Sequence, residues 1–332
     1  MNSFGRIFRI HLHGESHGWE VGVTIDGCPA GLPLAPGDFQ TDLDRRRSGM
    51  PGTTARQEAD LPEIRCGVYK NRTSGAPLMI SFRNRDFRSS DYLNGPRAPR
   101  PGHADFAANE KFAGWNDPRG GGMFSGRLTL GLVAAGVVAK KILSPLAIRA
   151  ELVAVAGSRD IQNAVSAVEK AGDSAGGLLE CRATRVPAGL GEPFFDSLES
   201  LIAHIVFSIP GIKGIEFGAG FGSAAMTGSR FNDLIVNKRG HTQSNNSGGC
   251  NGGISNGNPV VFRVAARPTA SIARGQNTFN PNSGKREVIH LKGRHDTCFA
   301  LRLPVILEAV SAVVFADLLS LAGKITPVRR KT

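Results

Sequence analysis

The sequence predicts an α+β fold in which apolar helices are enclosed by β-sheet on more than one side. Two helical segments are apolar around their whole circumference, whereas a surface helix would show a single apolar stripe. Several short segments elsewhere in the chain alternate apolar and polar residues, which is the pattern of strands with one buried face. Helices without a polar face need cover on several sides, and the expected strands can supply it.

The expected strands are short and well separated. Phe4–Leu12 alternates apolar and polar residues and is expected to end near Gly14. By the same reasoning we expect further strands at Val21–Asp26, Ala76–Phe82, Leu178–Val186, Gly214–Phe217 and Pro259–Ala266.

Three helices are expected. Pro36–Arg46 begins with a proline, which is suited to a first helical turn. The two apolar helices are Leu128–Leu143, rich in Ala, Val and Leu, and Pro304–Leu321, which stops before Gly323. Two glycine-rich polar segments cannot form a core and are expected to be loops, at Gly120–Gly122 and Ser244–Gly257.

Length and charge limit the classes of protein. The chain has 332 residues, 41% of them hydrophobic, and 40 Lys+Arg against 28 Asp+Glu, a net charge of +12. This apolar content excludes disorder. At roughly 150 residues per domain the chain is one large domain or two ordinary ones; we expect a single domain over residues 1–327 and a basic tail at 328–332. The surplus of positive charge suits nucleic acid, an acidic membrane or a small polyanion.

The cysteines and apolar runs indicate a cytoplasmic protein. Five cysteines are scattered without a CxxC pair, so reduced thiols and no metal site are expected. The run Leu128–Ala139 has twelve residues, short of the roughly 20 that span a bilayer. The N-terminus lacks the apolar core of a signal peptide. We therefore expect no membrane partner.

The segment HLHGESHG places four polar residues, His11, His13, Glu15 and His17, at a spacing of two. On a continuing strand they would share one face, as metal ligands do, and a histidine there could transfer protons near neutral pH. If the strand ends at Gly14, the segment is equally well a polar strand end without a function.

Three further segments could bind anions. The first is an expected helix end with three arginines, Arg45, Arg46 and Arg47. These side chains are either solvated, or their guanidiniums bind carboxylate or phosphate groups through paired hydrogen bonds. Residues 100–127 combine arginines and His103 with a glycine-rich loop that enters a helix, an arrangement that binds anions. No Walker motif is present, and GAGFGS at 218–223 lacks the context of a dinucleotide fold. The sequence GRHD at 293–296, by itself, is also typical of a surface turn.

Taken in order, these segments resemble the chorismate synthase family. The motifs are GESHG (14–18), DLDRRR (42–47), RPGHAD (100–105), RGGG (119–122), GGxxGGISNG (248–257), RPTAS (267–271) and GRHD (293–296). The resemblance covers essentially the whole chain. It implies a β-α-β sandwich with buried helices between antiparallel sheets.

The resemblance also implies an activity. Members are lyases that eliminate phosphate from 5-enolpyruvylshikimate 3-phosphate to give chorismate, the last step of the shikimate pathway. They need reduced FMN although the reaction has no net redox change, and they are typically homotetramers. A small substrate with two carboxylates and a phosphate would account for many of the arginines without nucleic acid.

Carried over by position, the resemblance implies roles for individual residues. His17, with Ser16 beside it, would protonate the departing phosphate, His103 would lie by the flavin, and Asp296 would assist proton removal. The substrate anions would be bound by Arg46, Arg47, Arg100 and Arg127. The flavin would be bound by Ser125, which is also a catalytic candidate, and by Gly252, Arg267, Pro268, Thr269, Ala270, Ser271 and Arg294.

The chain departs from the family's commoner pattern near the flavin. Met123 and Phe124 stand where most members have Arg-Ser, and Pro210 and Gly211 replace an Asn-Ala pair. The flavin contacts must therefore differ, and Phe124 could pack on a ring face. The resemblance allows NADPH as the reductant, but a second arginine often assigned to it is absent here.

Three alternatives follow from the same residues. The departures at Met123 and Phe124 are also consistent with a catalytically impaired homologue. The pI of about 10.0 is typical of nucleic-acid-binding proteins, although aromatic residues make up only 7% and no zinc, RRM or KH signature is present. A metal hydrolase built on the HLHGESH histidines would need bound zinc.

Overall fold

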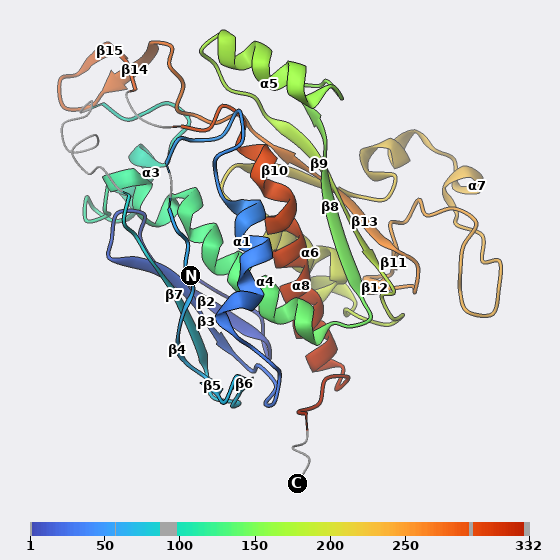
Figure 1. Cartoon of the computed structure of the whole chain (residues 1–332). Helices are drawn as coiled ribbons and strands as arrows, with labels where there is room; N and C mark the ends of the chain where they lie inside the picture. The colour runs from blue at the N-terminus through green and yellow to red at the C-terminus, as the bar shows by residue number, and fades with distance from the viewer. Residues whose placement is uncertain (1, 57, 87–97, 292–294, 329–332) are drawn as a thin grey trace.

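Helices lie between two antiparallel sheets in this protein (Figure 1). The computed structural model describes residues 2–56, 58–86, 98–291 and 295–328. The first sheet has the order β1 (Ser3–Phe4), β2 (Arg9–Gly14), β3 (Glu20–Asp26), β7 (Leu78–Arg83) and β4 (Glu63–Cys66). The second has the order β10 (Ile212–Phe217), β13 (Val260–Ala266), β9 (Gly177–Thr184) and β8 (Ala147–Val155). The expected β-α-β sandwich is confirmed.

Two helices form the centre of the enclosed layer. α4 (Thr129–Ile142) packs on the first sheet, α8 (Leu303–Leu321) packs on the second, and the two helices contact each other along their length. A Cβ at Gly136 would lie 2.3 Å from the Cβ of Ala309, so the glycine permits this close approach. The helices need no polar face because protein surrounds them on every side.

Helix α8, with the turn before it, is the longest apolar segment. Phe299–Leu321 is long and apolar enough to cross a membrane by length and composition, which corrects the expectation drawn from the shorter run. However, 78% of its most apolar window is buried inside the protein. Packing between the sheets therefore accounts for the composition of this helix.

The first expected strand is interrupted, which corrects the prediction for Phe4–Leu12. Between β1 and β2 the chain turns, and three consecutive backbone N–H groups, of residues 6–8, donate to the carboxylate of Asp317 at 2.8–3.0 Å. Asp317 is buried in α8. A contact across some 310 positions of sequence thus overrides the local alternation of polarity.

The other expected elements agree with the structure to within a few residues. The helix expected over Pro36–Arg46 is a 3-10 turn, η1 (Pro36–Phe39), followed by α1 (Gln40–Arg46). The expected loop Ser244–Gly257 contains a small hairpin of β11 (Cys250–Asn251) and β12 (Ile254–Ser255). The elements that the sequence did not predict include α3 (Asp105–Lys111), α5 (Ile161–Lys170), α6 (Leu198–Val206), β8, and the hairpin of β14 (Gln276–Asn280) and β15 (Lys285–Ile289).

Candidate active site

A cavity of about 1150 Å³ lies where α4 and α8 begin and α1 ends. The short turns η2 (Arg119–Phe124) and η3 (Gly126–Leu128) lead into α4, and η6 (Phe299–Arg302) leads into α8. Residues from both halves of the sequence line it. The positive ends of two long helices therefore meet at one cavity, which favours anions there.

The three consecutive arginines at the C-terminal end of α1 contact three different partners. Arg45 forms a bidentate pair with Glu308 of α8 at 2.7 and 2.8 Å. Arg46 is 4% exposed and points to the inner wall of the cavity. Arg47 donates to the backbone oxygen of Ala59 at 2.9 Å. Only Arg46 and Arg47 line the cavity, so Arg45 orients the helix rather than the site.

Asp60 joins two of the predicted substrate-binding arginines. Its Oδ2 is 3.3 Å from Nη1 of Arg46, and its Oδ1 is 2.5 Å from Nη1 of Arg127. Arg127 also donates from Nε to Asn84 at 2.9 Å. Burial lowers the pKa of Arg46 to about 9, with Asp60 acting in the opposite direction. The two guanidiniums thus share one buried counter-charge.

Several buried N–H groups on the cavity wall have no hydrogen-bond partner among the described residues. They are Nε of Arg47, Nε of Arg56, Nη2 of Arg127 and Nε of Arg302. A buried donor without an acceptor is costly. The guanidiniums themselves converge on one cavity, and their summed positive charge favours a ligand with anionic groups.

Ser16 and His17 lie against the glycine-rich loop η2. The backbone N–H of Ser16 donates to the oxygen of Gly122 at 3.1 Å, and Nη1 of Arg56 is 3.3 Å from the Ser16 hydroxyl. A Cβ at Gly120 would lie 2.7 Å from Nε2 of His17 and 2.9 Å from Oγ of Ser16. The glycine therefore lets the loop touch both side chains, and His17 is only 5% exposed.

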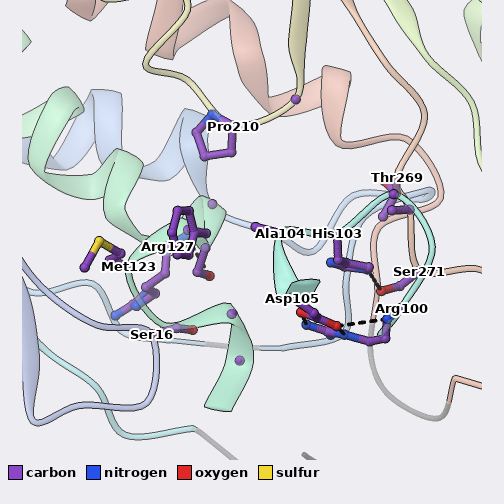
Figure 2. Close-up of a pocket in the computed structure, with 18 of the residues that line it drawn as sticks. Ser16, Arg100, His103, Ala104, Asp105, Met123, Arg127, Pro210, Thr269 and Ser271 are labelled. Atoms are coloured by element: carbon purple, nitrogen blue, oxygen red, sulfur yellow. Dashed lines mark hydrogen bonds and ion pairs between the residues drawn. The ribbon is translucent and has the colours of Figure 1, made fainter. Parts of the chain in front are cut away.

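His103 lies on the other side of the cavity from Ser16 in Figure 2. Its Nε2 is 2.7 Å from the hydroxyl of Ser271. Burial, followed by the charge of Arg100, lowers the pKa of His103 to about 4, so the ring is neutral at pH 7. The guanidinium of Arg100 itself pairs with Asp105 through two contacts of 2.7 Å.

Asp296 is held at the base of α8. Its Oδ1 accepts from the backbone N–H of Thr54 at 2.8 Å, and its Oδ2 pairs with Nη2 of Arg302. Both Asp296 and Arg302 line the cavity. The carboxylate is thereby fixed at the same cavity as His17.

Most of the residues predicted to bind flavin border the cavity. Ser125, Arg267, Thr269, Ala270 and Ser271 line it, and the buried Thr269 hydroxyl has no hydrogen-bond partner among the described residues.

Three predicted flavin residues are not among those lining this cavity. Pro268 is absent from its lining, and Gly252 lies in the β11–β12 turn, on a different part of the chain. Arg294, like the tail at 329–332, lies outside the described residues.

His11 and His13 lie on one face of β2, but the strand ends at Gly14 and His17 does not share that face. His11 contacts the hydroxyl of Ser3 at 2.7 Å, His13 packs by Gly22 within the first sheet, and His17 turns into the cavity. Within the described part of the chain, no three His, Cys, Asp or Glu side chains are grouped as metal ligands would be. The alternation in this segment therefore does not build a cluster.

Several charged residues of the cavity were not assigned roles from the sequence, among them Arg56, Glu58, Asp60 and Arg302. Glu58 is buried and accepts from Arg56 at 2.7 Å and from two backbone N–H groups, of residues 85 and 86. For Arg56, Glu58 and Asp60 the sequence signal is the alternation of one arginine and two acids in the segment 56–60, which is equally typical of an exposed loop. Arg302 stands six residues after Asp296 of the GRHD motif.

Comparisons with known proteins agree on one family. The family model described as chorismate synthase matches residues 8–320. A chorismate synthase of Chitinophaga pinensis is 57% identical over 322 residues, 97% of each chain. One of Methanocella arvoryzae is 44% identical, covering 98% of this chain and 96% of its own. A crystal structure titled as chorismate synthase superposes with a TM-score of 0.75 at 27% identity, over 97% of this chain and 95% of the other.

Proposed function

Because this chain belongs to the chorismate synthase family, we infer that it catalyses the anti-1,4-elimination of phosphate from 5-enolpyruvylshikimate 3-phosphate to give chorismate. It is a carbon–oxygen lyase that acts on a phosphate, and this reaction is the last step of the shikimate pathway. The reaction must hold a substrate with three anionic groups while breaking a C–H and a C–O bond.

The observation that carries this function is the convergence of Arg46, Arg47, Arg56, Arg127 and Arg302 on one cavity. Guanidinium forks match carboxylate and phosphate oxygens. We assign the substrate anions to Arg47 and Arg127, with Arg56 added because it reaches Ser16. Arg46 is included for its positive charge at the same cavity, although each of its three nitrogens already has a protein partner. Arg100 is assigned a supporting role beside His103, since Asp105 occupies two of its donors.

Proton transfer falls to two groups of this chain. His17 protonates the departing phosphate oxygen, and its position between Ser16 and Gly120 holds the ring at the arginine side of the cavity. Asp296, fixed by Thr54 and Arg302, assists removal of the C6 proton. Ser125, at the start of η3, lines the same wall.

The residues near His103 fit a flavin. The cavity exceeds the needs of the substrate alone, and the buried Thr269 hydroxyl and the guanidinium of Arg267 offer partners for a phosphate or ribityl chain. Reduced FMN, when bound, supplies electron density to the breaking C–O bond. His103 and Ser271 would hydrogen-bond it, and the ring of His103 is neutral at pH 7.

The side chains that replace the family's Arg-Ser give the cavity an apolar wall. The ring of Phe124 lies 6.4 Å from that of Phe112, at 53°. Met123, Phe124 and Pro210 all line the cavity. An aromatic face and a thioether can pack on a planar ring system, in place of hydrogen bonds to it.

We also propose a cytoplasmic homotetramer. Large apolar side chains are exposed on the single chain, with Phe194, Phe195 and Phe221 at 86%, 92% and 83%. Such exposure favours contact with another subunit. Light scattering of the purified protein tests the assembly. All five cysteines are free in the structure, in keeping with a reducing compartment.

The test is anaerobic incubation with the phosphorylated substrate and chemically reduced FMN, followed by assay of chorismate and phosphate. We expect both products in equal amounts. His17→Ala should lower turnover by about 10²–10⁴-fold, the usual range for a general acid, while FMN still binds. His241→Ala, an exposed histidine outside the cavity, is the matched control.

Two results would contradict these assignments. Absence of both products from the wild-type protein, with flavin and substrate bound, would identify an impaired homologue. Wild-type turnover in His17→Ala would remove the proposed acid while leaving the activity in place.

A further inference from the structure

We propose that Asp60 is a positioning residue that fixes the separation and orientation of Arg46 and Arg127 for the substrate's anionic groups. The inference rests on the proposed function, because it concerns the same site. Asp60 lies outside all seven motifs that this chain shares with the family.

The geometry is a bridge by one carboxylate. Each oxygen of Asp60 contacts a different guanidinium, at 3.3 Å for Arg46 and 2.5 Å for Arg127. The side chain of Asp60 is 2% exposed, and those of the two arginines are 5% and 6%. A bridge so far from solvent admits few alternative arrangements.

Other contacts hold the far edges of both guanidiniums. Arg46 donates from Nε to the Thr129 hydroxyl at 3.0 Å and from Nη2 to the oxygen of Gly126 at 3.2 Å. Arg127 donates from Nε to Asn84 at 2.9 Å. Its Nη2 has no hydrogen-bond partner among the described residues but lies 4.0 Å from Oε2 of Glu58, as an ion pair. Within the described part of the chain, Asp60 is the side chain that hydrogen-bonds to both guanidiniums, so it links their positions directly.

The backbone of Asp60 supports a specific role. Its φ is +48°, in the left-handed region, which most residues with a side chain avoid and which aspartate adopts more readily than most. Such conformations persist where the surroundings dictate them, and they concentrate at functional sites. Here the turn aims the carboxylate between the two arginines.

A carboxylate in this place has a cost for binding. It repels an incoming anion and cancels part of the attraction of Arg46 and Arg127. Its presence is therefore explained by orientation, not by affinity. Removal of the charge should leave anion binding as tight or tighter, and it should lower the rate, because misplaced groups lose about 10²-fold in turnover.

The experiment compares wild type, Asp60→Asn and the control Asp173→Asn, an aspartate outside the cavity that pairs with Arg274. For Asp60→Asn we expect kcat to fall about 10²-fold, with KM unchanged or lower. In titrations with inorganic phosphate, we expect affinity equal to or tighter than that of the wild type. Asp173→Asn should match the wild type in all three.

Several outcomes would overturn the inference. They are an unchanged kcat, a loss confined to KM, or weaker binding of phosphate by Asp60→Asn. A wild-type protein that forms no chorismate would refute the proposed function instead. The role of Asp60 would then be judged by the phosphate titration alone, in which weaker binding by Asp60→Asn would refute it. If Asp60→Asn does not fold, Asp60→Glu keeps the charge and displaces the bridge, so the same fall in kcat with phosphate binding retained is expected.

Discussion

His103 allows a prediction about stability that needs neither substrate nor flavin. The histidine is buried beside Arg100, and its pKa is about 4 in the folded chain, against about 6.5 in an unfolded one. The folded state therefore binds this proton less readily than the unfolded state does. The stabilising contribution is complete above pH 6.5 and is lost as the pH falls toward 4.

The magnitude follows from the two pKa values. Between pH 7 and pH 5, His103 should lower the free energy of unfolding by about 2 kcal/mol, rising to about 3 kcal/mol by pH 4. His103→Gln removes the titrating ring and keeps a group that can reach the Ser271 hydroxyl. The variant should therefore lose about 2 kcal/mol less than the wild type between pH 7 and pH 5.

Denaturant unfolding at a series of pH values measures this difference. Other groups titrate over the same range, but they cancel between the wild type and the variant. His241→Gln, a change at an exposed histidine, should follow the wild-type curve. Parallel curves for the wild type and His103→Gln would refute the argument that burial and Arg100 keep this ring neutral.

Two further substitutions test the packing of the site and of the enclosed helices. Gly120→Ala would bring a Cβ to 2.7 Å from Nε2 of His17, so we expect turnover to fall by at least about 10²-fold. The control is Gly121→Ala, because Gly121 also has a positive φ but open space where a Cβ would lie. This control should retain most activity, and equal losses in the two variants would rule out the contact with His17 as the cause. Glu308→Gln removes the buried carboxylate that pairs with Arg45 and Lys140, while both cations are partly exposed and keep their contacts with Asp42. The free energy of unfolding should therefore fall by about 1–2 kcal/mol; a denaturation midpoint equal to that of the wild type would contradict this.

The sequence predicted the centre of the fold better than its edges. An apolar circumference requires cover on all sides, and α4 and α8 are indeed enclosed by the two sheets. The break between β1 and β2 could not be predicted, because it depends on Asp317, some 310 residues away. Local periodicity describes which face of a segment is apolar and contains nothing about such distant partners.

The candidate site was predicted unevenly for a similar reason. His17, His103 and Asp296 lie in sequence motifs that can be recognised without a structure, and all three line one cavity. Glu58 and Asp60 stand in a polar segment that looks like a solvated loop. Their role depends on the guanidiniums that the fold brings around them, which only the structure reveals.

Glu58 and Asp60 offset part of the positive charge that the chain concentrates at the cavity. A cavity that binds a polyanion must hold several guanidiniums together before the ligand arrives, and buried like charges repel one another. Glu58 and Asp60 neutralise part of that charge in the ligand-free protein, through contacts of 2.7 Å to Arg56 and 2.5 Å to Arg127. The positive charge that remains on the guanidiniums is what would attract an anionic substrate. A site made of arginines alone would attract anions more strongly, but mutual repulsion would leave the guanidiniums without one fixed arrangement. The proposed anion site therefore includes the two acids.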